Sequence, residues 1–216
     1  MNKKYILFDL DGTLTDSREG IINSIEHALG YYNIKIEDRD SLIPFLGPPL
    51  VESFRKYFNF DQKKAEEAVV HYREYFGVKG LLENQVYDGV EELMKSLRNR
   101  KYELLLATSK PEVYAKRIMD HFGLSQYFTF IGGASMDESR CRKADVIRYV
   151  LESNGITDLS LVMMVGDRDQ DVNGARKIGT EVIGVLYGYG SLEELQAAGA
   201  DYIAETPMDV LRILEK

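Results

Sequence analysis

The chain has 216 residues, which is enough for one large domain or for one domain with a modest insertion. Its content of 44% hydrophobic and 29% charged residues is that of an ordinary soluble globular protein. No apolar stretch approaches the roughly 18 residues needed to cross a bilayer. The net charge of −8 argues against non-specific nucleic-acid binding, so any site for an anionic substrate must concentrate positive charge locally.

The cysteine content and the N-terminal residues indicate a cytoplasmic protein. Cys141 is the single cysteine of the sequence and cannot form an internal disulfide, which fits a reducing compartment. Its basic neighbours are the kind that lower a thiol pKa, but the sequence places no histidine beside it, which disfavours a catalytic cysteine. The start, Met1 to Lys4, leads directly into an apolar run and leaves no room for a signal peptide.

The first predicted element is a buried strand over residues 5–8, which ends in the stretch Asp9-Leu10-Asp11-Gly12-Thr13. The alternation of a strand points Asp9 and Asp11 to the same side, where the two carboxylates repel each other beside a hydrophobic core. A hard cation such as Mg²⁺ would resolve this conflict. Because an ionised aspartate held against Mg²⁺ is also a nucleophile for phosphorus, the pair predicts a catalytic centre.

Two other interpretations of this stretch remain open at this point. A calcium-binding loop of the EF-hand type needs its glycine at the sixth position, whereas Gly12 follows at the fourth position and a β-type run precedes it. The alternative of a plain turn with solvated acids is compatible with the same residues.

A helical insertion follows the first strand, over residues 16–82. Apolar residues at helical spacing predict helices over 19–32, 50–57 and 61–76, with breaks at Gly47-Pro48-Pro49 and near Asn59. The insertion is rich in aromatic residues, which a small helical bundle needs for its core; one or two could instead stack on a substrate ring. These residues are Tyr31, Tyr32, Phe45, Phe54, Tyr57, Phe58, Phe60, Tyr72, Tyr75 and Phe76.

From about residue 84 onward, short β-rich runs alternate with amphipathic stretches. Strands are predicted over 102–107, 128–131, 161–165 and 181–186, and helices over 91–98 and 143–154, with another helix starting at Asn173. The residues from Ser109 to Glu112 are predicted to open a further helix through a capping box. Such alternation predicts an α/β fold, with a parallel sheet covered by helices on both faces.

Further polar residues stand where strands end or a helix begins, which is where open α/β sheets bind ligands. Thr108 follows the strand ending at residue 107, and its hydroxyl can donate to a phosphoryl oxygen. Lys143 can neutralise both a nucleophile and a phosphoryl group, although a lone lysine is usually solvated. In Gly166–Asp171, Asp167 is placed for direct metal ligation and Asp171 for orienting Lys143.

As a set, these motifs resemble those of the haloacid dehalogenase-like hydrolase superfamily, in the phosphatase branch whose helical cap follows the first motif. The resemblance implies a Rossmann-like core over residues 1–15 and 83–216, a helical cap over 16–82, Mg²⁺ dependence and an aspartyl-phosphate intermediate. The residues that carry it are the stretch Asp9 to Thr13, Thr108, Lys143 and the stretch Gly166 to Asp171.

The resemblance also implies a role for each motif residue. Asp9 would attack phosphorus, and Asp11 would protonate the leaving oxygen and then deprotonate the water. The metal would be held by Asp9, the Asp11 carbonyl and Asp167, and Asp171 would support the metal and Lys143. The phosphoryl group would be bound by Gly12, Thr108, Ser109 and Lys143.

Finer resemblance points to the cluster labelled phosphoglycolate phosphatase-like or 5′-nucleotidase-like. Many relatives carry proline directly after the motif lysine, whereas here Lys143 is followed by Ala144, which leaves the chemistry intact. Asp11 disfavours a dehalogenase, which lacks this second aspartate, and the absence of membrane helices disfavours an ion pump. A phosphomutase of the β-phosphoglucomutase type and a catalytically silent binding protein remain as alternatives, although His27 lies too far along to match the mutase histidine.

The expected substrate is a small phosphorylated metabolite, with no nucleic acid or membrane partner, and the sequence does not determine the oligomeric state. The apolar, aromatic cap mildly favours a nucleoside 5′-monophosphate over phosphoglycolate, and a proline-containing loop at residues 46–50 is expected to face the catalytic centre. Arg55, His71 and Arg73 are candidates for binding a substrate anion. Hinges are expected near residues 15–16 and 82–84.

Overall fold

The computed structural model describes residues 1–137 and 139–216, which form two compact units. One unit comprises residues 1–15 and 86–216, and the other comprises residues 16–85. The first is built on a six-stranded sheet in the order β5-β4-β1-β6-β7-β8, in which each neighbouring pair of strands is parallel. The predicted α/β fold with a parallel sheet is therefore confirmed.

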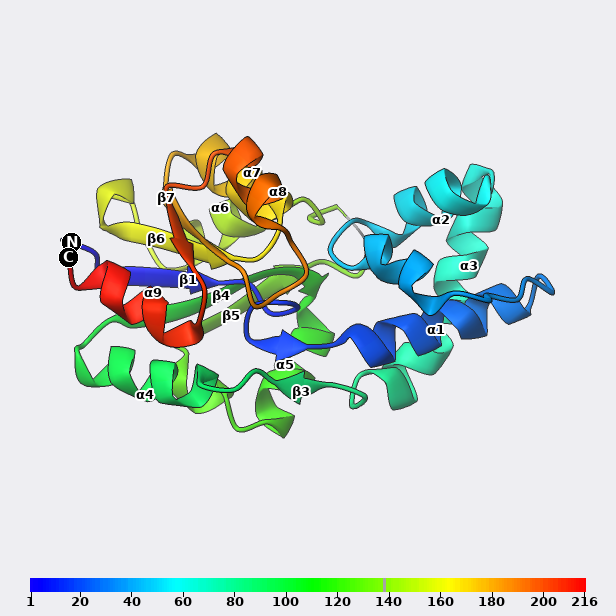
Figure 1. The fold of residues 1–216 in the computed structure, drawn as a ribbon, viewed down its shortest axis with the longest axis horizontal. Helices are drawn as coiled ribbons and strands as arrows, with labels where there is room; N and C mark the ends of the chain where they lie inside the picture. Colours follow the sequence, from blue (N-terminus) through cyan, green and yellow to red (C-terminus); the bar gives the residue numbers. More distant parts are fainter. Residues whose placement is uncertain (138) are drawn as a thin grey trace. The chain divides into compact units, whose positions relative to one another are not determined.

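The strands of this sheet are short and largely buried, as expected for strands that are covered on both faces. They are β1 (Tyr5–Phe8), β4 (Glu103–Pro111), β5 (Phe130–Ala134), β6 (Val162–Gly166), β7 (Glu181–Val185) and β8 (Tyr202–Ala204). Helices follow them along the chain: α4 (Val90–Asn99), α5 (Glu112–His121), α6 (Lys143–Ser153), α7 (Asp169–Ile178), α8 (Leu192–Ala198) and α9 (Pro207–Leu214). Figure 1 shows α6, α7 and α8 over one face of the sheet, with α4, α5 and α9 on the other side.

The position of β1 in the centre of the sheet determines where the polar motifs meet. Phe8, the last residue of β1, is in register with Leu106 of β4 on one side and with Val165 of β6 on the other. Asp9 follows β1 and Asp167 follows β6 at the same edge, and Thr108 lies near the end of β4. Because ligands bind at the carboxyl edge of such a sheet, this register brings the three motifs to one place.

The second unit is helical and contains α1 (Arg18–Gly30), a 3₁₀ segment (Arg39–Phe45), α2 (Leu50–Phe58), α3 (Gln62–Tyr75) and a π-helical turn (Phe76–Gly80). Its core is aromatic: Phe45, Phe54 and Phe76 are buried, and the Phe54 and Phe60 rings stack with centroids 6.0 Å apart. The structural role predicted for these side chains is confirmed. Two short strands, β2 (Thr15–Asp16) and β3 (Gln85–Val86), form a separate two-stranded sheet.

Two helix starts differ from the predictions. The prediction that a capping box opens a helix at Ser109 is wrong, because β4 continues in extended conformation to Pro111 and α5 begins at Glu112 without a side-chain cap. Proline disfavours the helical conformation of the residue before it, which here is Lys110. In the other case, α7 begins at Asp169, four residues before the predicted start, and the Asp171 carboxylate accepts a hydrogen bond from the Arg168 N–H at 3.1 Å, which satisfies the backbone at this helix start.

Candidate active site

Asp9, Lys143 and Asp171 form a buried ionic group at the carboxyl edge of the sheet. The Lys143 Nζ lies 2.7 Å from Asp9 Oδ1 and 2.8 Å from Asp171 Oδ1, and it donates to the Ala107 carbonyl at 3.0 Å. Lys143 is the first residue of α6, and Asp171 lies in the first turn of α7. One ammonium group therefore connects the end of β1 with the Ala107 carbonyl of β4 and with α7, which follows β6.

Asp167 is fully buried directly after β6, and the backbone around it is tightly packed. Its Oδ1 accepts a hydrogen bond from the Thr13 hydroxyl at 3.3 Å, and its Oδ2 accepts one from the Tyr189 N–H at 2.8 Å. Gly12 has a φ of +80°, and a Cβ at this position would lie 2.1 Å from Asp167 Oδ2. A Cβ at Gly188 would lie 2.4 Å from the Asp167 Cβ. Only glycine fits at either position.

The charges do not balance at this site: the carboxylates of Asp9, Asp167 and Asp171 lie together, and Asp9 and Asp171 share one ammonium, that of Lys143. Burial raises the pKa of Asp167, and the charges of Asp171 and Asp9 raise it further. Burial also raises the pKa of Asp171, against the opposing charge of Lys143. For Lys143, burial lowers the pKa, but the charges of Asp171 and Asp9 outweigh this effect and the net shift is upward. The site therefore favours the addition of positive charge.

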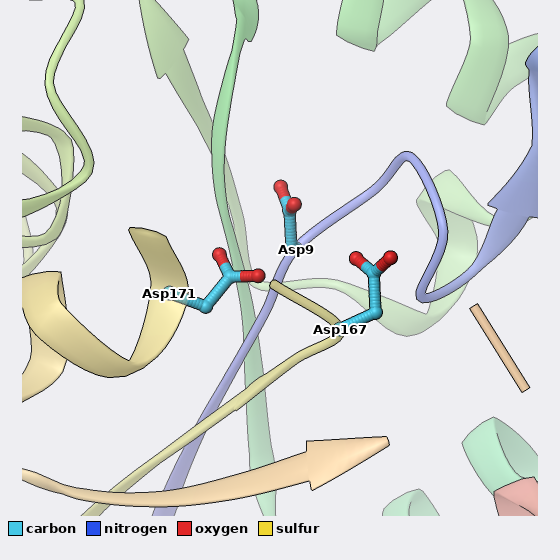
Figure 2. Close-up of side chains that lie close together, drawn as sticks. All are labelled: Asp9, Asp167 and Asp171. Atoms are coloured by element: carbon cyan, nitrogen blue, oxygen red, sulfur yellow. The ribbon is translucent and has the colours of Figure 1, made fainter. Parts of the chain in front are cut away.

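The donor set fits a hard divalent cation. Asp9, Asp167 and Asp171 each offer a carboxylate oxygen, and these oxygens lie within 4.8 Å of one another. Figure 2 shows the three side chains grouped together, each from a different segment of the chain. Oxygen ligands of this kind suit Mg²⁺. In Asp171, Oδ1 contacts Lys143 and Oδ2 accepts from the Arg168 N–H at 3.1 Å, so both of its oxygens already have protein partners.

Asp11 is held by a second buried lysine. The Lys110 Nζ lies 2.9 Å from Asp11 Oδ2, and the two side chains are 5% and 16% exposed. Asp11 lies in the turn after β1, where the Gly12 N–H donates to the Thr15 carbonyl at 2.8 Å. Lys110 was not among the predicted site residues, because a lysine next to a predicted helix start is typical of a solvated surface.

The remaining residues that were predicted to bind substrate lie along the turn after β1 and the end of β4. Thr108 is buried, and its Oγ1 accepts a hydrogen bond from the Lys110 N–H at 3.2 Å. The pairing of β4 with β5 shifts register between Thr108 and Pro111, so Ser109 lies on an irregular stretch. Gly12 packs on Asp167 as described above. The substrate-binding roles of these residues stay predictions.

Two of the candidates in the helical unit, Arg55 and His71, have partners within that unit. The Arg55 guanidinium donates to Gln62 Oε1 at 3.2 Å. The His71 ring stacks on Tyr31 with centroids 3.6 Å apart, and its Nδ1 lies 3.2 Å from Glu74 Oε2. Arg73 lies in the last turn of α3. A role for these residues toward a substrate anion also stays a prediction.

The loop after β7 and the start of α8 contribute groups that the sequence analysis did not assign. The Tyr189 N–H and Gly188 hold Asp167 as described above. On α8, Glu194 accepts from Arg168 Nε at 2.7 Å and from the Asp169 N–H at 2.9 Å, which fixes the turn after Asp167. The two Tyr-Gly pairs at residues 187–190 are the sequence signal that marks this loop, because tight backbone packing needs glycine.

Comparison with known proteins identifies the family. The model of the haloacid dehalogenase-like hydrolase family matches residues 6–185, which include every motif residue described above. The chain belongs to the haloacid dehalogenase-like hydrolase family. The resemblance drawn from the sequence motifs is therefore confirmed.

Three similar proteins extend this finding across nearly the whole chain. A 5′-nucleotidase of Pseudomonas aeruginosa is 47% identical over 89% of this chain and 86% of its own length. The tyrosine-protein kinase PtkA of Mycobacterium tuberculosis is 40% identical over 95% of this chain and 67% of its own length. The crystal structure of a predicted phosphatase from Clostridium acetobutylicum superposes with a TM-score of 0.95, at 49% identity, over 99% of both chains.

Across the part of the chain that the structure describes, none of the helices is both long and apolar enough to traverse a lipid bilayer.

Proposed function

We propose that this member of the haloacid dehalogenase-like hydrolases is a Mg²⁺-dependent phosphatase of small phosphate monoesters that works through an aspartyl-phosphate on Asp9. The observation that carries the proposal is the Asp9–Lys143 pair, which places a buried carboxylate 2.7 Å from a buried ammonium at the sheet edge. The lysine can stabilise charge on a phosphoryl group attached to Asp9, and such charge stabilisation dominates phosphoryl transfer.

In the first half-reaction, a carboxylate oxygen of Asp9 forms a bond to phosphorus and the bond from phosphorus to the leaving oxygen breaks. The electron pair of that bond goes to the leaving oxygen, which takes a proton from Asp11. In the second half-reaction, Asp11 takes a proton from water as the water oxygen attacks phosphorus. The bond between phosphorus and Asp9 then breaks, which releases phosphate and restores both aspartates.

Mg²⁺ would be held by Asp9, Asp167 and the Asp11 carbonyl. When bound, it supplies positive charge to the phosphoryl oxygens and offsets the repulsion among the buried carboxylates. The protein's part is to keep these oxygens in place: Thr13 and Tyr189 hold the two oxygens of Asp167, while Asp171 holds Lys143.

We propose a nucleoside 5′-monophosphate as the first substrate to test and phosphoglycolate as the second. The support for the nucleotide is the 47% identity to a protein named 5′-nucleotidase, together with the aromatic helical unit. The test is kcat/KM over a panel of nucleoside 5′-monophosphates, phosphoglycolate, sugar phosphates and pyrophosphate in the presence of Mg²⁺. One substrate that exceeds the rest by about a hundredfold, or roughly 2.7 kcal/mol, would identify the reaction.

The variant Asp9→Asn tests the mechanism. We expect turnover to vanish while the circular dichroism spectrum and the melting temperature stay close to those of the wild type. Acid quenching during turnover of a phosphate-labelled substrate should trap a hydroxylamine-sensitive label on the wild type and none on the variant. Unchanged turnover in Asp9→Asn, or turnover unaffected by chelation of Mg²⁺, would overturn the proposal.

A second candidate function is phosphoryl transfer to a tyrosine hydroxyl, which the 40% identity to a tyrosine-protein kinase favours. The same Asp9 and Asp11 would serve, with the phenol in place of water. Incubation with γ-labelled ATP and a tyrosine-containing acceptor separates the two functions. Label recovered as free phosphate supports hydrolysis, and label on the acceptor supports transfer.

A further inference from the structure

Lys110 is a buried cation that the proposed chemistry leaves without a role. The residue is 8% exposed, and burial of an ammonium is costly unless an opposite charge is close by. Its partner is Asp11, the proposed acid and base, at 2.9 Å. This pair is separate from the ion pairs of Lys143 with Asp9 and Asp171.

The contact makes the two carboxylate oxygens of Asp11 unequal. Lys110 Nζ contacts Oδ2, whereas Oδ1 is buried and has no hydrogen-bond partner among the residues that the structure describes. Rotation about the last bond of the aspartate side chain would exchange these oxygens, and the ion pair opposes that rotation. Oδ1 therefore stays available for a proton transfer.

The backbone explains how Lys110 reaches this position. β4 stays extended to Pro111, and the Lys110 N–H donates to Thr108 Oγ1 at 3.2 Å. The shift of register after Thr108 belongs to the same stretch. A helix that began at Ser109 would have turned the lysine away from the sheet edge, so the extended end of β4 is what brings the ammonium to Asp11.

We propose that Lys110 is a positioning residue that fixes Asp11 by Oδ2, so that Oδ1 donates the proton to the leaving oxygen and later accepts one from water. This inference rests on the proposed phosphatase function. Lys110 acts through Asp11 and needs no contact with the phosphoryl group. Loss of Lys110 should therefore slow a substrate whose leaving oxygen must be protonated more than a substrate whose leaving group departs as a stable anion.

The experiment compares two leaving groups in Lys110→Met, which keeps the length of the side chain and removes the charge. A nucleoside alcohol leaves poorly without a proton, whereas p-nitrophenolate leaves readily. Because kcat/KM reports the formation of the aspartyl-phosphate and not its hydrolysis by water, it isolates the step in which the leaving oxygen takes its proton. General acid catalysis contributes about 10²–10⁴-fold, so we expect kcat/KM for a nucleoside 5′-monophosphate to fall by about 10² and kcat/KM for p-nitrophenyl phosphate to fall by less than about fivefold.

Two further variants complete the design. Lys110→Arg keeps the charge and should recover at least about a tenth of the wild-type kcat/KM on the nucleotide, given that an arginine can make the same ion pair. Lys116→Met is the matched control, since Lys116 is an exposed lysine of α5 that pairs with Glu112. This variant should leave kcat/KM on both substrates unchanged. If Lys110→Met does not fold, Lys110→Gln supplies the same comparison.

Each other outcome would overturn the inference. An equal loss of kcat/KM on both substrates would mean a purely structural role. A rise in KM confined to phosphoglycolate, which carries a second anion, would mean that Lys110 binds substrate directly. Asp9→Asn is assayed beside the series to keep the two proposals distinguishable. If Asp9→Asn is inactive and Lys110→Met loses activity equally on both substrates, the role of Lys110 is rejected while the phosphatase function is retained.

Discussion

The sheet unit and the helical unit bury different kinds of polar residue. In the part of the chain that the structure describes, every buried charged side chain belongs to the sheet unit: Asp9, Lys110, Lys143, Asp167 and Asp171. The buried polar residues of the helical unit are serines, Ser17, Ser24 and Ser53. Burial of a charge costs several kcal/mol unless an opposite charge pairs with it. The cluster of buried charges therefore marks the sheet unit as the unit that holds the candidate active site.

The helical unit follows the ordinary rule for a small bundle. Its charged residues stay at the surface, as the half-exposed Glu74 and Arg39 do, and its stability comes from aromatic packing. The difference teaches that removal of a buried charge should damage turnover as well as stability, whereas removal of a buried ring should damage stability alone.

Lys143→Ala should give the largest effect. It removes the ammonium that contacts Asp9 and Asp171, so kcat should fall by about 10³ through loss of transition-state charge stabilisation. The free energy of unfolding should also fall by about 3–5 kcal/mol, because the buried carboxylates lose their partner. Steady-state kinetics and urea unfolding measure the two losses. A change in KM alone would show that Lys143 only binds substrate.

Phe54→Ala should lower stability while leaving turnover intact. The ring is fully buried and lies 5.3 Å from the Phe45 ring, so its loss should destabilise the helical unit by about 3–5 kcal/mol. At a temperature where the variant is folded, kcat on p-nitrophenyl phosphate should stay within about twofold of the wild type, since no charge of the site is altered. The half-exposed Tyr57 offers the control, and Tyr57→Ala should cost less than about 1 kcal/mol. A large loss of kcat in folded Phe54→Ala would contradict the expected difference between the two units.

The smallest expected effect is a dependence of the free energy of unfolding on pH, measured in the presence of a chelator. Burial raises the pKa of Asp171 to about 6, above its ordinary value of 3.8, so the native state binds more protons than the unfolded state between these values. The free energy of unfolding should therefore decrease as pH rises from about 4 to about 6, and Asp171→Asn should flatten this slope. Melting temperatures in EDTA across this range measure it. A steady increase in melting temperature over the same range would contradict the prediction.

Much of the sheet unit could be predicted from the sequence because its signals are local. The apolar run of β1 and the aspartates after it specify a strand and its charged end without reference to the rest of the chain. The same holds for Lys143 at the start of α6. The parallel sheet then brings these ends together, so the positions of Asp9, Lys143 and Asp171 follow from strand order.

The features that were missed depend on contacts between distant segments. The Lys110–Asp11 pair forms only because β4 runs past its predicted end, and a capping pattern at Ser109 gave no sign of it. The hold of Glu194 on the turn after Asp167 joins residues about 25 positions apart. Hydrophobic periodicity carries no information on such pairs, since both partners are polar and neither lies in a regular pattern.

The tight packing around Asp167 has a consequence for how this protein tolerates sequence change. Gly188 and Gly190 are only partly exposed glycines of a connecting loop, a setting that mutational scans usually find permissive. A Cβ at Gly190 would lie 2.0 Å from the Asp167 carbonyl oxygen, and one at Gly188 would lie 2.2 Å from the Gly12 carbonyl oxygen. A library built over this loop should therefore be depleted at the two glycines as severely as at the aspartates themselves.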